Sequence, residues 1–355
     1  RGREAPQLTR FDGLLDRADL PSLANGRTIL SATQLENWVR CPYAYFMRYV
    51  LGVGALDQPA DEDGITPLER GSLAHEILDR FLTESIEADD LPSHAAPWGP
   101  DHHQRLDRIC DEEFALVESR GLTGRPLLWQ RDGGRLRRNL QEFLFHDNER
   151  RSNDLLTPVA AEMAFGFDGN EPLVLRLADG RTLRFRGRID RVDRAVGGGL
   201  VVTDFKTGKK QYYNKVSEDS PDVDGQYLQL PLYGLAARER LATPDTDVEV
   251  RYWFLTDGGE IVGHPLSDPV LGRFDHVLTT IIDGIEQGFF PARPPKSSYG
   301  IGCDYCDPDD LGTKSRTNLW DRKRQDPRLD DYRRLIGDLF DDGPIAVIDL
   351  GGSDD

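Results

Sequence analysis

The sequence predicts an α/β fold with a helical insertion ahead of its sheet, and two hydrophobic patterns carry that prediction. Between residues 158 and 206, apolar and polar residues alternate in short runs, as in half-buried β-strands. In residues 104–120 and 126–151, apolar side chains recur at intervals of three and four, as in amphipathic helices. A chain of 355 residues can bury a substantial core, in one large domain or two modest ones.

The N-terminal part is predicted to be helical after a short arm. Residues 1–29 are mixed in charge and interrupted by Gly and Pro, so we expect a linker or an arm that lies on the domain. Ser31 and Gln34 form a capping box for a first helix, and Pro42 suits the first turn of the next one. A further capped helix opens a helical part expected over about 66–152.

The sheet is expected to be a meander of consecutive strands within a core that covers about 156–290. The predicted strands are 158–167, 173–177, 182–194 and 200–206. Gly-containing turns separate them, which is typical of strands joined by hairpins. The later predicted elements are a helix over 226–241, a strand over 248–256, a short strand after the turn at 257–259, and a helix over 271–287.

The stretch 187–208, GRIDRVDRAVGGGLVVTDFKTG, places two acidic residues and a lysine on neighbouring strands. A hairpin closed by Gly197–Gly199 brings Asp190 beside Asp204. Alternation along the strand turns Asp204 and Lys206 to one face. Such a trio can bind Mg²⁺ or Mn²⁺ and orient or activate water for phosphodiester hydrolysis. The alternative is a surface hairpin on which Asp190 and Lys206 form an ordinary ion pair.

Two further side chains are candidates for the same site. His75 shares an apolar helix stripe with Leu78 and Leu82, so its imidazole is expected to point inward, as a metal ligand or as a core histidine. Glu162, on the first predicted strand, points toward the same end of the sheet. It is an additional acid or, as is more common, a paired surface carboxylate.

The net charge of −18 argues against a nucleic-acid partner, but the distribution of charge reverses that objection. Residues 176–215 contain 11 basic and 4 acidic residues, whereas residues 304–355 contain 8 basic and 14 acidic residues. The basic block is therefore the one that holds the two aspartates. Arginines around the apolar face of the 126–151 helix form either a solvated helix face or a groove that follows phosphates.

Composition also indicates the cellular compartment in which we expect the protein. No apolar run approaches the ~18 residues of a membrane span and no signal peptide is visible, so we expect no membrane partner. Four cysteines do not make a disulfide framework, which predicts a cytoplasmic protein. Because the sequence begins at Arg1 without a methionine, we expect it to be part of a longer polypeptide.

Five short motifs follow one another along the chain. They are SATQLENWVRCPYAYF (31–46), GSLAHEIL (71–78), GRIDRVD (187–193), DFKTG (204–208) and QLPLY (229–233). In this order they resemble the RecB-like branch of the PD-(D/E)XK nuclease superfamily, close to the nuclease domain of AddB-type helicase-nuclease subunits. The resemblance places the nuclease domain at 30–325. It implies a restriction-endonuclease-like core with a mixed central sheet, flanking helices and an N-terminal helical insertion.

The resemblance also implies roles for individual residues. They are His75, Asp190 and Asp204 as metal ligands, Lys206 as a catalytic residue, and Gln229 and Tyr233 as residues that support the site or contact DNA. The arginines that we expect to contact DNA are Arg188, Arg191, Arg135 and Arg138. The implied cofactor is Mg²⁺ or Mn²⁺.

The cysteines suggest a second metal centre. Cys303 and Cys306 form a two-cysteine knuckle, and with Cys41 they match three of the four cysteines that hold an iron–sulfur cluster in AddB-like relatives. The fourth position falls at Gly312, so the three cysteines are expected to hold a [4Fe–4S] cluster with another fourth ligand, or Zn²⁺; the alternative for Cys41 is a small buried thiol. Cys110 matches no motif and is predicted to lie in the core.

These features predict a metal-dependent DNA nuclease, an exonuclease domain of a helicase-nuclease complex that acts in DNA end processing, recombinational repair or defence. Its partners would be single-stranded DNA or duplex ends, and a helicase-type module in the same chain or in a partner subunit, since no Gly-x-x-x-x-Gly-Lys loop is present. A catalytically silent DNA-binding or scaffolding module and a metal hydrolase for another substrate are the alternatives. Residues 326–355 are predicted to form an acidic tail, disordered or bound to a partner from Asp338 onward.

Overall fold

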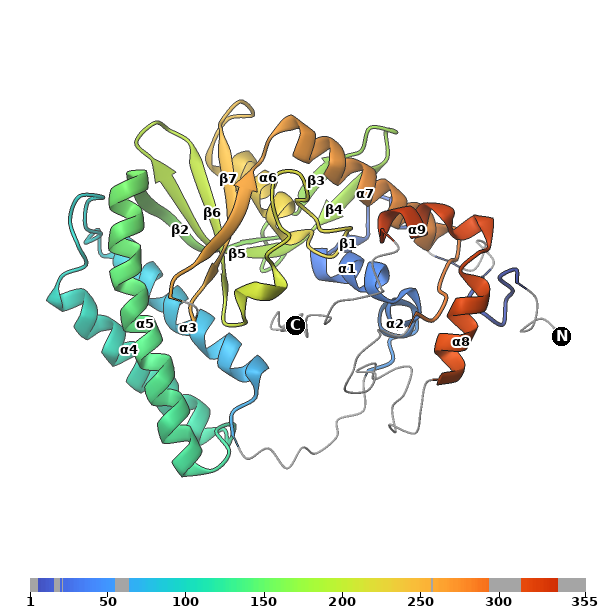
Figure 1. Cartoon of the computed structure of the whole chain (residues 1–355). Helices are drawn as coiled ribbons and strands as arrows, with labels where there is room; N and C mark the ends of the chain where they lie inside the picture. The colour runs from blue at the N-terminus through green and yellow to red at the C-terminus, as the bar shows by residue number, and fades with distance from the viewer. Residues whose placement is uncertain are drawn as a thin grey trace.

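A five-stranded sheet lies at the centre of the molecule. The computed structural model describes residues 6–15, 20, 22–54, 64–256, 258–293 and 314–337. The strands, in their spatial order, are β2 (Leu156–Phe165), β5 (Gly187–Ala195), β6 (Leu200–Lys206), β7 (Val248–Phe254) and β8 (Ile261–Pro265). Only the β6–β7 pair of this sheet is parallel, so the sheet is mixed and the predicted α/β class is confirmed (Figure 1).

Three long helices cover one face of the sheet at the β2 side (Figure 1). They are α3 (Pro67–Glu87), α4 (Pro100–Ser119) and α5 (Pro126–Asp154). Their apolar stripes share a buried core with Phe205 and Trp253 of the sheet. The predicted helical insertion is therefore present, and Pro100 and Pro126 each occupy the first turn of a helix, where a missing N–H costs nothing.

The opposite face is covered by helices from distant parts of the sequence. They are α1 (Ala32–Arg40), α6 (Gln229–Leu241) and α7 (Asp268–Glu286). Trp38 of α1 and Tyr252 of β7 belong to the core beneath them. α6 is the crossover between the parallel strands β6 and β7, which a hairpin could not connect. The short helix α2 (Pro42–Tyr45) and a single π-helical turn (Phe46–Val50) follow α1. Among the described residues, no helix combines the length and apolar character that a membrane span requires.

The predicted meander is wrong, because the strand predicted over 182–194 is two strands in different sheets. β4 (Thr182–Phe185) pairs with β3 (Leu173–Arg176) and with β1 (Ile29–Leu30) in a separate three-stranded sheet. At Arg186 the chain leaves that sheet, with its N–H bound to the carbonyl of Leu30 at 2.8 Å. β5 then pairs with β2, whereas the meander would have paired β2 with β3.

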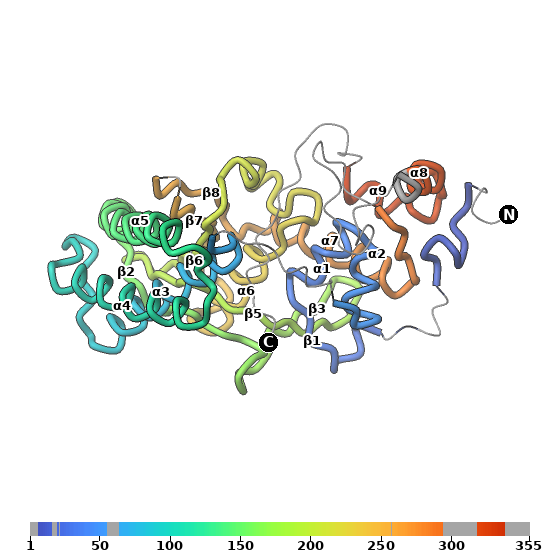
Figure 2. Tube along the Cα trace, turned by 90° about the horizontal axis from the view of Figure 1, so that it is seen from below, coloured from blue at the N-terminus to red at the C-terminus, as the bar shows by residue number. Residues whose placement is uncertain are grey.

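The N-terminal arm and the C-terminal helices lie side by side (Figures 1 and 2). The last described elements are α8 (Lys314–Lys323), a 3₁₀ turn (Pro327–Leu329) and α9 (Asp330–Leu335). The backbone N–H of Leu8 donates to Asp326 at 2.6 Å, and the Tyr332 hydroxyl donates to the carbonyl of Val39 at 2.9 Å. Residues 326–337 are therefore packed on the domain and do not form a tail; residues 338–355 lie outside the described part.

Candidate active site

Asp190 and Asp204 lie next to each other on the paired strands β5 and β6. Arg191 stands opposite Thr203 in this antiparallel pair, so the adjacent position brings the two aspartates together. Both are buried, with 8% and 4% of their surface exposed. Asp190 Oδ2 accepts a hydrogen bond from the backbone N–H of Phe205 at 2.5 Å. The hairpin predicted from the triple glycine thus forms and joins the two carboxylates.

Lys206 extends over the same end of the sheet. Its Nζ lies 2.6 Å from Asp204 Oδ2, donates to Gln229 Oε1 at 3.3 Å, and lies 5.1 Å from the centre of the Tyr252 ring. Burial is the largest single effect and disfavours the ammonium, but the nearby acidic groups, with Asp204 first among them, together outweigh it and raise the pKa of Lys206. The lysine is therefore a fixed cation at neutral pH, able to donate hydrogen bonds but not to take up a proton.

His75 reaches this centre from α3. Its Nδ1 lies 3.4 Å from Asp190 Oδ1. Burial is the largest single effect and disfavours the imidazolium, but the charge and hydrogen bond of Asp190, with the charge of Asp204, together outweigh it and raise the pKa of His75 to about 9. The inward-facing histidine thus contacts an acidic residue, which a core histidine surrounded by apolar side chains would not do.

Glu162 completes the cluster, although the sequence pattern favoured a surface carboxylate at this position. The positions on either side of Glu162 in β2 and Asp190 in β5 are paired, which sets the two residues opposite each other. Its backbone has a φ of +42°, an unusual conformation for a residue with a side chain. Burial and the charge of Asp190 raise the pKa of Glu162 to about 8. The side chain is 18% exposed and pairs with Arg188, as the surface-carboxylate interpretation expected, but that interpretation missed its place beside His75 and Asp190.

The reason for this error lies in the strand order. The predicted meander separates the Glu162 strand from the Asp190 strand by the strand predicted over 173–177, so alternation alone could not bring these residues together. The length of its strand is the signal that could have identified Glu162. At ten residues, β2 is long enough to pair along the whole of β5.

The donor set fits a hard divalent cation. One ligand atom each from His75, Glu162 and Asp190 lies within 4.8 Å of the others, close to the separation of ligands across one ion at about 2.1 Å from each. Asp204 adds a buried oxygen: its Oδ2 pairs with Lys206 Nζ but has no hydrogen-bonding partner of suitable geometry among the described residues. Carboxylate oxygens suit hard cations such as Mg²⁺ and Mn²⁺, and the single imidazole is a ligand that divalent transition metals also accept.

Gln229 and Tyr233 occupy successive turns of α6, as their spacing predicted. Gln229 contacts Lys206 directly, as described above. Tyr233 is 8% exposed and packs edge-on against Phe165 of β2 at 6.1 Å. Burial, with the nearby charge of Asp204, raises its pKa. Gln229 is thus part of the site, while Tyr233 fixes α6 on the sheet beneath it.

The four arginines expected to contact DNA have different environments. The side chain of Arg188 is 51% exposed and its Nε lies 3.5 Å from Glu162, at the rim of the carboxylate cluster. Arg135 and Arg138 are exposed on α5 and form no ion pair with any described residue. The other arginines of this helix segment are paired with acids, Arg131 with Asp132 and Arg137 with Asp107 and Asp111.

Arg191 is not on the surface, so the prediction that it contacts DNA is wrong. Its side chain is 0% exposed, donates to Asp193 at 2.7 Å, and donates to Asp147 of α5 at 2.6 Å. Asp147 also binds Arg151, whose Nε is 2.8 Å away. This buried network ties α5 to the strand that carries Asp190. Alternation along β5 is the reason: residue 191 points away from the face of residue 190.

Of the three cysteines predicted to share a metal centre, only Cys41 lies in the described part of the chain. It is buried at the start of α2, whereas Cys303 and Cys306 lie outside the described residues. Cys110 is buried in α4, where burial raises its pKa to about 12, as expected for a core thiol.

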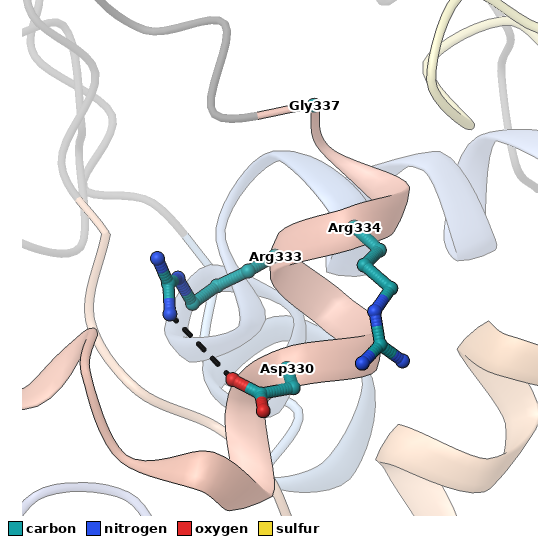
Figure 3. Close-up of a pocket in the computed structure, with 4 residues that line it drawn as sticks. All are labelled: Asp330, Arg333, Arg334 and Gly337. Carbon is teal, nitrogen blue, oxygen red and sulfur yellow. Dashed lines mark ion pairs between the residues drawn. The ribbon is translucent and has the colours of Figure 1, made fainter.

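A cavity of about 370 Å³ lies away from the carboxylate cluster, on α9, the last helix of the described residues. It is lined by Asp330, Arg333, Arg334 and Gly337 (Figure 3). Asp330 and Arg333 form an ion pair at 3.5 Å across it. None of the residues of the carboxylate cluster lines this cavity, so it is separate from the candidate active site.

Comparison with known proteins agrees with this geometry. The family described as the PD-(D/E)XK nuclease superfamily matches residues 29–310. A protein from Clostridium acetobutylicum, named as the B subunit of an ATP-dependent helicase/deoxyribonuclease, is 26% identical over 267 residues, 70% of this chain and 20% of that protein. The protein of the same name from Moorella thermoacetica is 30% identical over 262 residues, 67% of this chain and 20% of that protein. The protein of the same name from Symbiobacterium thermophilum is 30% identical over 233 residues, 61% of this chain and 18% of that protein.

The chain thus spans about a fifth of the length of these relatives. The family match, in contrast, covers most of the chain and includes every residue of the carboxylate cluster. The chain therefore belongs to the PD-(D/E)XK nuclease superfamily.

Proposed function

We propose that this chain is a divalent-metal-dependent deoxyribonuclease domain. The observation that carries the proposal is the convergence of His75, Glu162 and Asp190 within 4.8 Å, with the Asp204–Lys206 pair beside them. A structural hairpin has no need of three carboxylates at one end of a sheet, two of them buried, because burying charge is costly.

The metal ligands in this proposal are His75, Glu162, Asp190 and Asp204. A bound Mg²⁺ or Mn²⁺ supplies positive charge that stabilises the negative charge developing on the phosphate oxygens. Burial is the largest cause of the raised pKa values of Glu162 and Asp204, so a nearby positive charge favours the ionised forms of both.

Lys206 holds a positive charge next to the scissile phosphate in this proposal. Because Asp204 raises its pKa, the ammonium stays protonated and donates hydrogen bonds to a phosphate oxygen or to the attacking water. Gln229 accepts one of its hydrogen bonds and so restricts its direction. Arg188, half exposed at the rim, is placed to bind a neighbouring phosphate.

We further propose that the domain works within a helicase-nuclease complex, as an exonuclease in end processing, repair or defence. The relatives are named as subunits of ATP-dependent helicase/deoxyribonucleases, and the matched region is about a fifth of each. Movement along DNA would then come from a helicase-type module in the same chain or in a partner subunit.

The test is cleavage of labelled linear single-stranded and duplex DNA with Mg²⁺ or Mn²⁺, with and without EDTA. Asp204→Ala and Lys206→Ala should each lower kcat by at least about 100-fold, as the loss of a charge-stabilising group does. Both should keep their DNA affinity, since exposed arginines provide it. Lys210→Ala is the matched control, a lysine that pairs with Glu260 outside the cluster and should cleave normally. DNA binding without metal-dependent cleavage would instead support a catalytically silent module.

A further inference from the structure

Helix α6 begins without a capping side chain of its own. Its N-cap residue is Leu228, which has no side-chain acceptor, and its first turn contains no acidic residue. The first N–H groups of a helix lack partners within the helix and need an acceptor from elsewhere. Here the N–H of Leu228 donates to Glu36 Oε1 at 2.6 Å, from a helix 192 residues away in the sequence.

The loop that leads into α6 is strained. Val223, Asp224 and Gly225 have consecutive φ values of +41°, +60° and +79°. A β-branched residue rarely adopts this conformation, so the surrounding structure must hold the loop in place. At its start, Asp222 accepts from the N–H of Gly225 at 2.7 Å and from Arg273 at 2.9 Å. At the other end of the loop, the N–H of Leu228 has its acceptor outside the loop.

Glu36 anchors that other end from α1. The residue is 4% exposed, and its Oε2 lies 3.7 Å from Arg40, which donates to the carbonyl of Gln226 at 3.2 Å. Burial raises the pKa of Glu36, while Arg40 and the N–H of Leu228 oppose that effect. A buried carboxylate is a costly way to fill a core position, so its value must lie in what it holds.

The helix end held by Glu36 carries Gln229. Gln229 is the first residue of α6, next in sequence to Leu228, and its Oε1 accepts from Lys206 at 3.3 Å. Lys206 in turn lies 2.6 Å from Asp204. The hydrogen bond of Leu228 to Glu36 and that of Gln229 to Lys206 therefore connect α1 to the catalytic cation.

We infer that Glu36 is a positioning residue for the nuclease site: it fixes the start of α6 from α1 and so sets Gln229 against the Lys206 ammonium. The inference rests on the proposed nuclease function for its kinetic consequence. Its structural part, the hold of Glu36 on Leu228, can be measured without any cleavage.

The kinetic test compares Glu36→Ala and Glu36→Gln with Asp326→Ala. Asp326 is a matched control, a buried carboxylate that accepts a backbone N–H at 2.6 Å, from Leu8, far from the site. Glu36→Ala should lower kcat by about 10- to 100-fold with KM for DNA within about twofold, because a small displacement of a catalytic group has that effect. Glu36→Gln keeps an acceptor oxygen and should restore most of kcat. Asp326→Ala should leave both constants unchanged.

A double-mutant cycle with Gln229→Ala identifies the route. If Glu36 acts through Gln229, the double variant should have a kcat close to that of Gln229→Ala alone. Fully additive losses would show that Glu36 does not act through Gln229, and equal losses in Glu36→Ala and Asp326→Ala would show a general effect on folding; either result would overturn the inference.

Hydrogen exchange provides the readout that does not depend on cleavage. The backbone amides of residues 226–230 and of Leu232 should exchange about fivefold faster or more in Glu36→Ala, since a lost hydrogen bond is worth about 1 kcal/mol, and at the normal rate in Asp326→Ala. Unchanged exchange in Glu36→Ala would overturn the role of Glu36 even if the parent cleaves DNA. A parent without cleavage, but with faster exchange in Glu36→Ala, would reject the nuclease proposal and retain the structural link.

Discussion

Arg188 and Arg191 lie three residues apart on β5 and have opposite environments. The side chain of Arg188 is 51% exposed beside Glu162, whereas that of Arg191 is fully buried between Asp147 and Asp193. An odd separation along a strand places the two side chains on opposite faces of the sheet. We therefore expect Arg188 to serve DNA binding and Arg191 to serve folding, although both belong to one motif.

Arg188→Ala should weaken DNA binding without destabilising the fold. Removing one phosphate contact lowers the magnitude of the slope of log K against log salt by about 0.7 to 0.9. A change at an exposed site should alter the free energy of unfolding by no more than about 0.5 kcal/mol. Titration of DNA at several salt concentrations, together with thermal unfolding, measures both quantities. An unchanged salt slope would remove Arg188 from the DNA interface.

Arg191→Ala should have the opposite profile. It leaves Asp147 and Asp193 buried without their shared partner, which typically costs about 3–5 kcal/mol. Chemical denaturation should show this loss, and the salt slope of DNA binding should be unchanged for the folded fraction. A stable Arg191→Ala protein with a reduced salt slope would mean that this arginine contacts DNA after all.

Glu162→Gln should stabilise the metal-free protein and weaken metal binding. The raised pKa shows that the charged form is disfavoured where Glu162 lies, so removing the charge relieves the cost of burial and the repulsion from Asp190. A gain of about 1 kcal/mol would raise Tm by roughly 2 °C for a chain of this size. Mn²⁺ affinity, measured by calorimetry, should fall at least about tenfold, because even indirect partners of a metal have effects of that size. Unchanged Mn²⁺ affinity would exclude Glu162 as a ligand.

The metal-free fold should lose stability as pH rises from 6.5 to about 9. The pKa of His75 is raised from 6.5 to about 9 in the folded protein, against the effect of burial, by Asp190. The folded state therefore holds this proton more tightly, and the stabilisation is complete below pH 6.5 and lost as pH passes about 9. The raised pKa of Glu162 acts in the same direction, since its ionisation on the way to about pH 8 is unfavourable in the folded state.

Thermal unfolding with EDTA between about pH 6 and pH 9.5 measures this loss of stability. This pH range includes both the unfolded and the folded pKa of His75. His75→Ala should flatten the curve and should also reduce Mn²⁺ affinity. Saturating Mn²⁺ should reverse the trend in the parent, because a ligating imidazole must be neutral and binding then releases a proton. A His75→Ala protein with the same pH profile as the parent would show that the histidine is only a core residue.

Tyr332→Phe should destabilise the domain without slowing cleavage. The Tyr332 hydroxyl donates to the carbonyl of Val39 and accepts from Arg293 at 2.9 Å, which joins α9 to α1. The loss of this hydroxyl removes two buried hydrogen bonds, at about 0.5–1.5 kcal/mol each, while Arg293 still donates to the carbonyl of Val39 at 3.1 Å. Denaturation gives the stability, and kcat of the folded protein should match the parent. A reduced kcat at full folding would indicate that α9 is coupled to the catalytic site.

Short-range patterns in the sequence were sufficient to predict the local parts of this site. Alternation placed Asp204 and Lys206 on one face of a strand, the triple glycine predicted the hairpin with Asp190, and the spacing of Gln229 and Tyr233 placed both on one side of a helix. These are consequences of fixed repeats, two residues in a strand and 3.6 in a helix, and they operate over a few residues. The helical insertion and the α/β class follow from the same repeats.

Which distant segments meet, in contrast, depends on how the whole chain packs. Glu162 belongs to the carboxylate cluster because β2 pairs with β5 while the β3–β4 hairpin joins another sheet, and alternation carries no information on the identity of a partner strand. Arg191 is buried because α5 covers its face and supplies Asp147, and Glu36 reaches Leu228 across 192 residues for a similar reason. Such contacts are set by packing of whole helices against the sheet, where burial and the pairing of buried charges decide the arrangement.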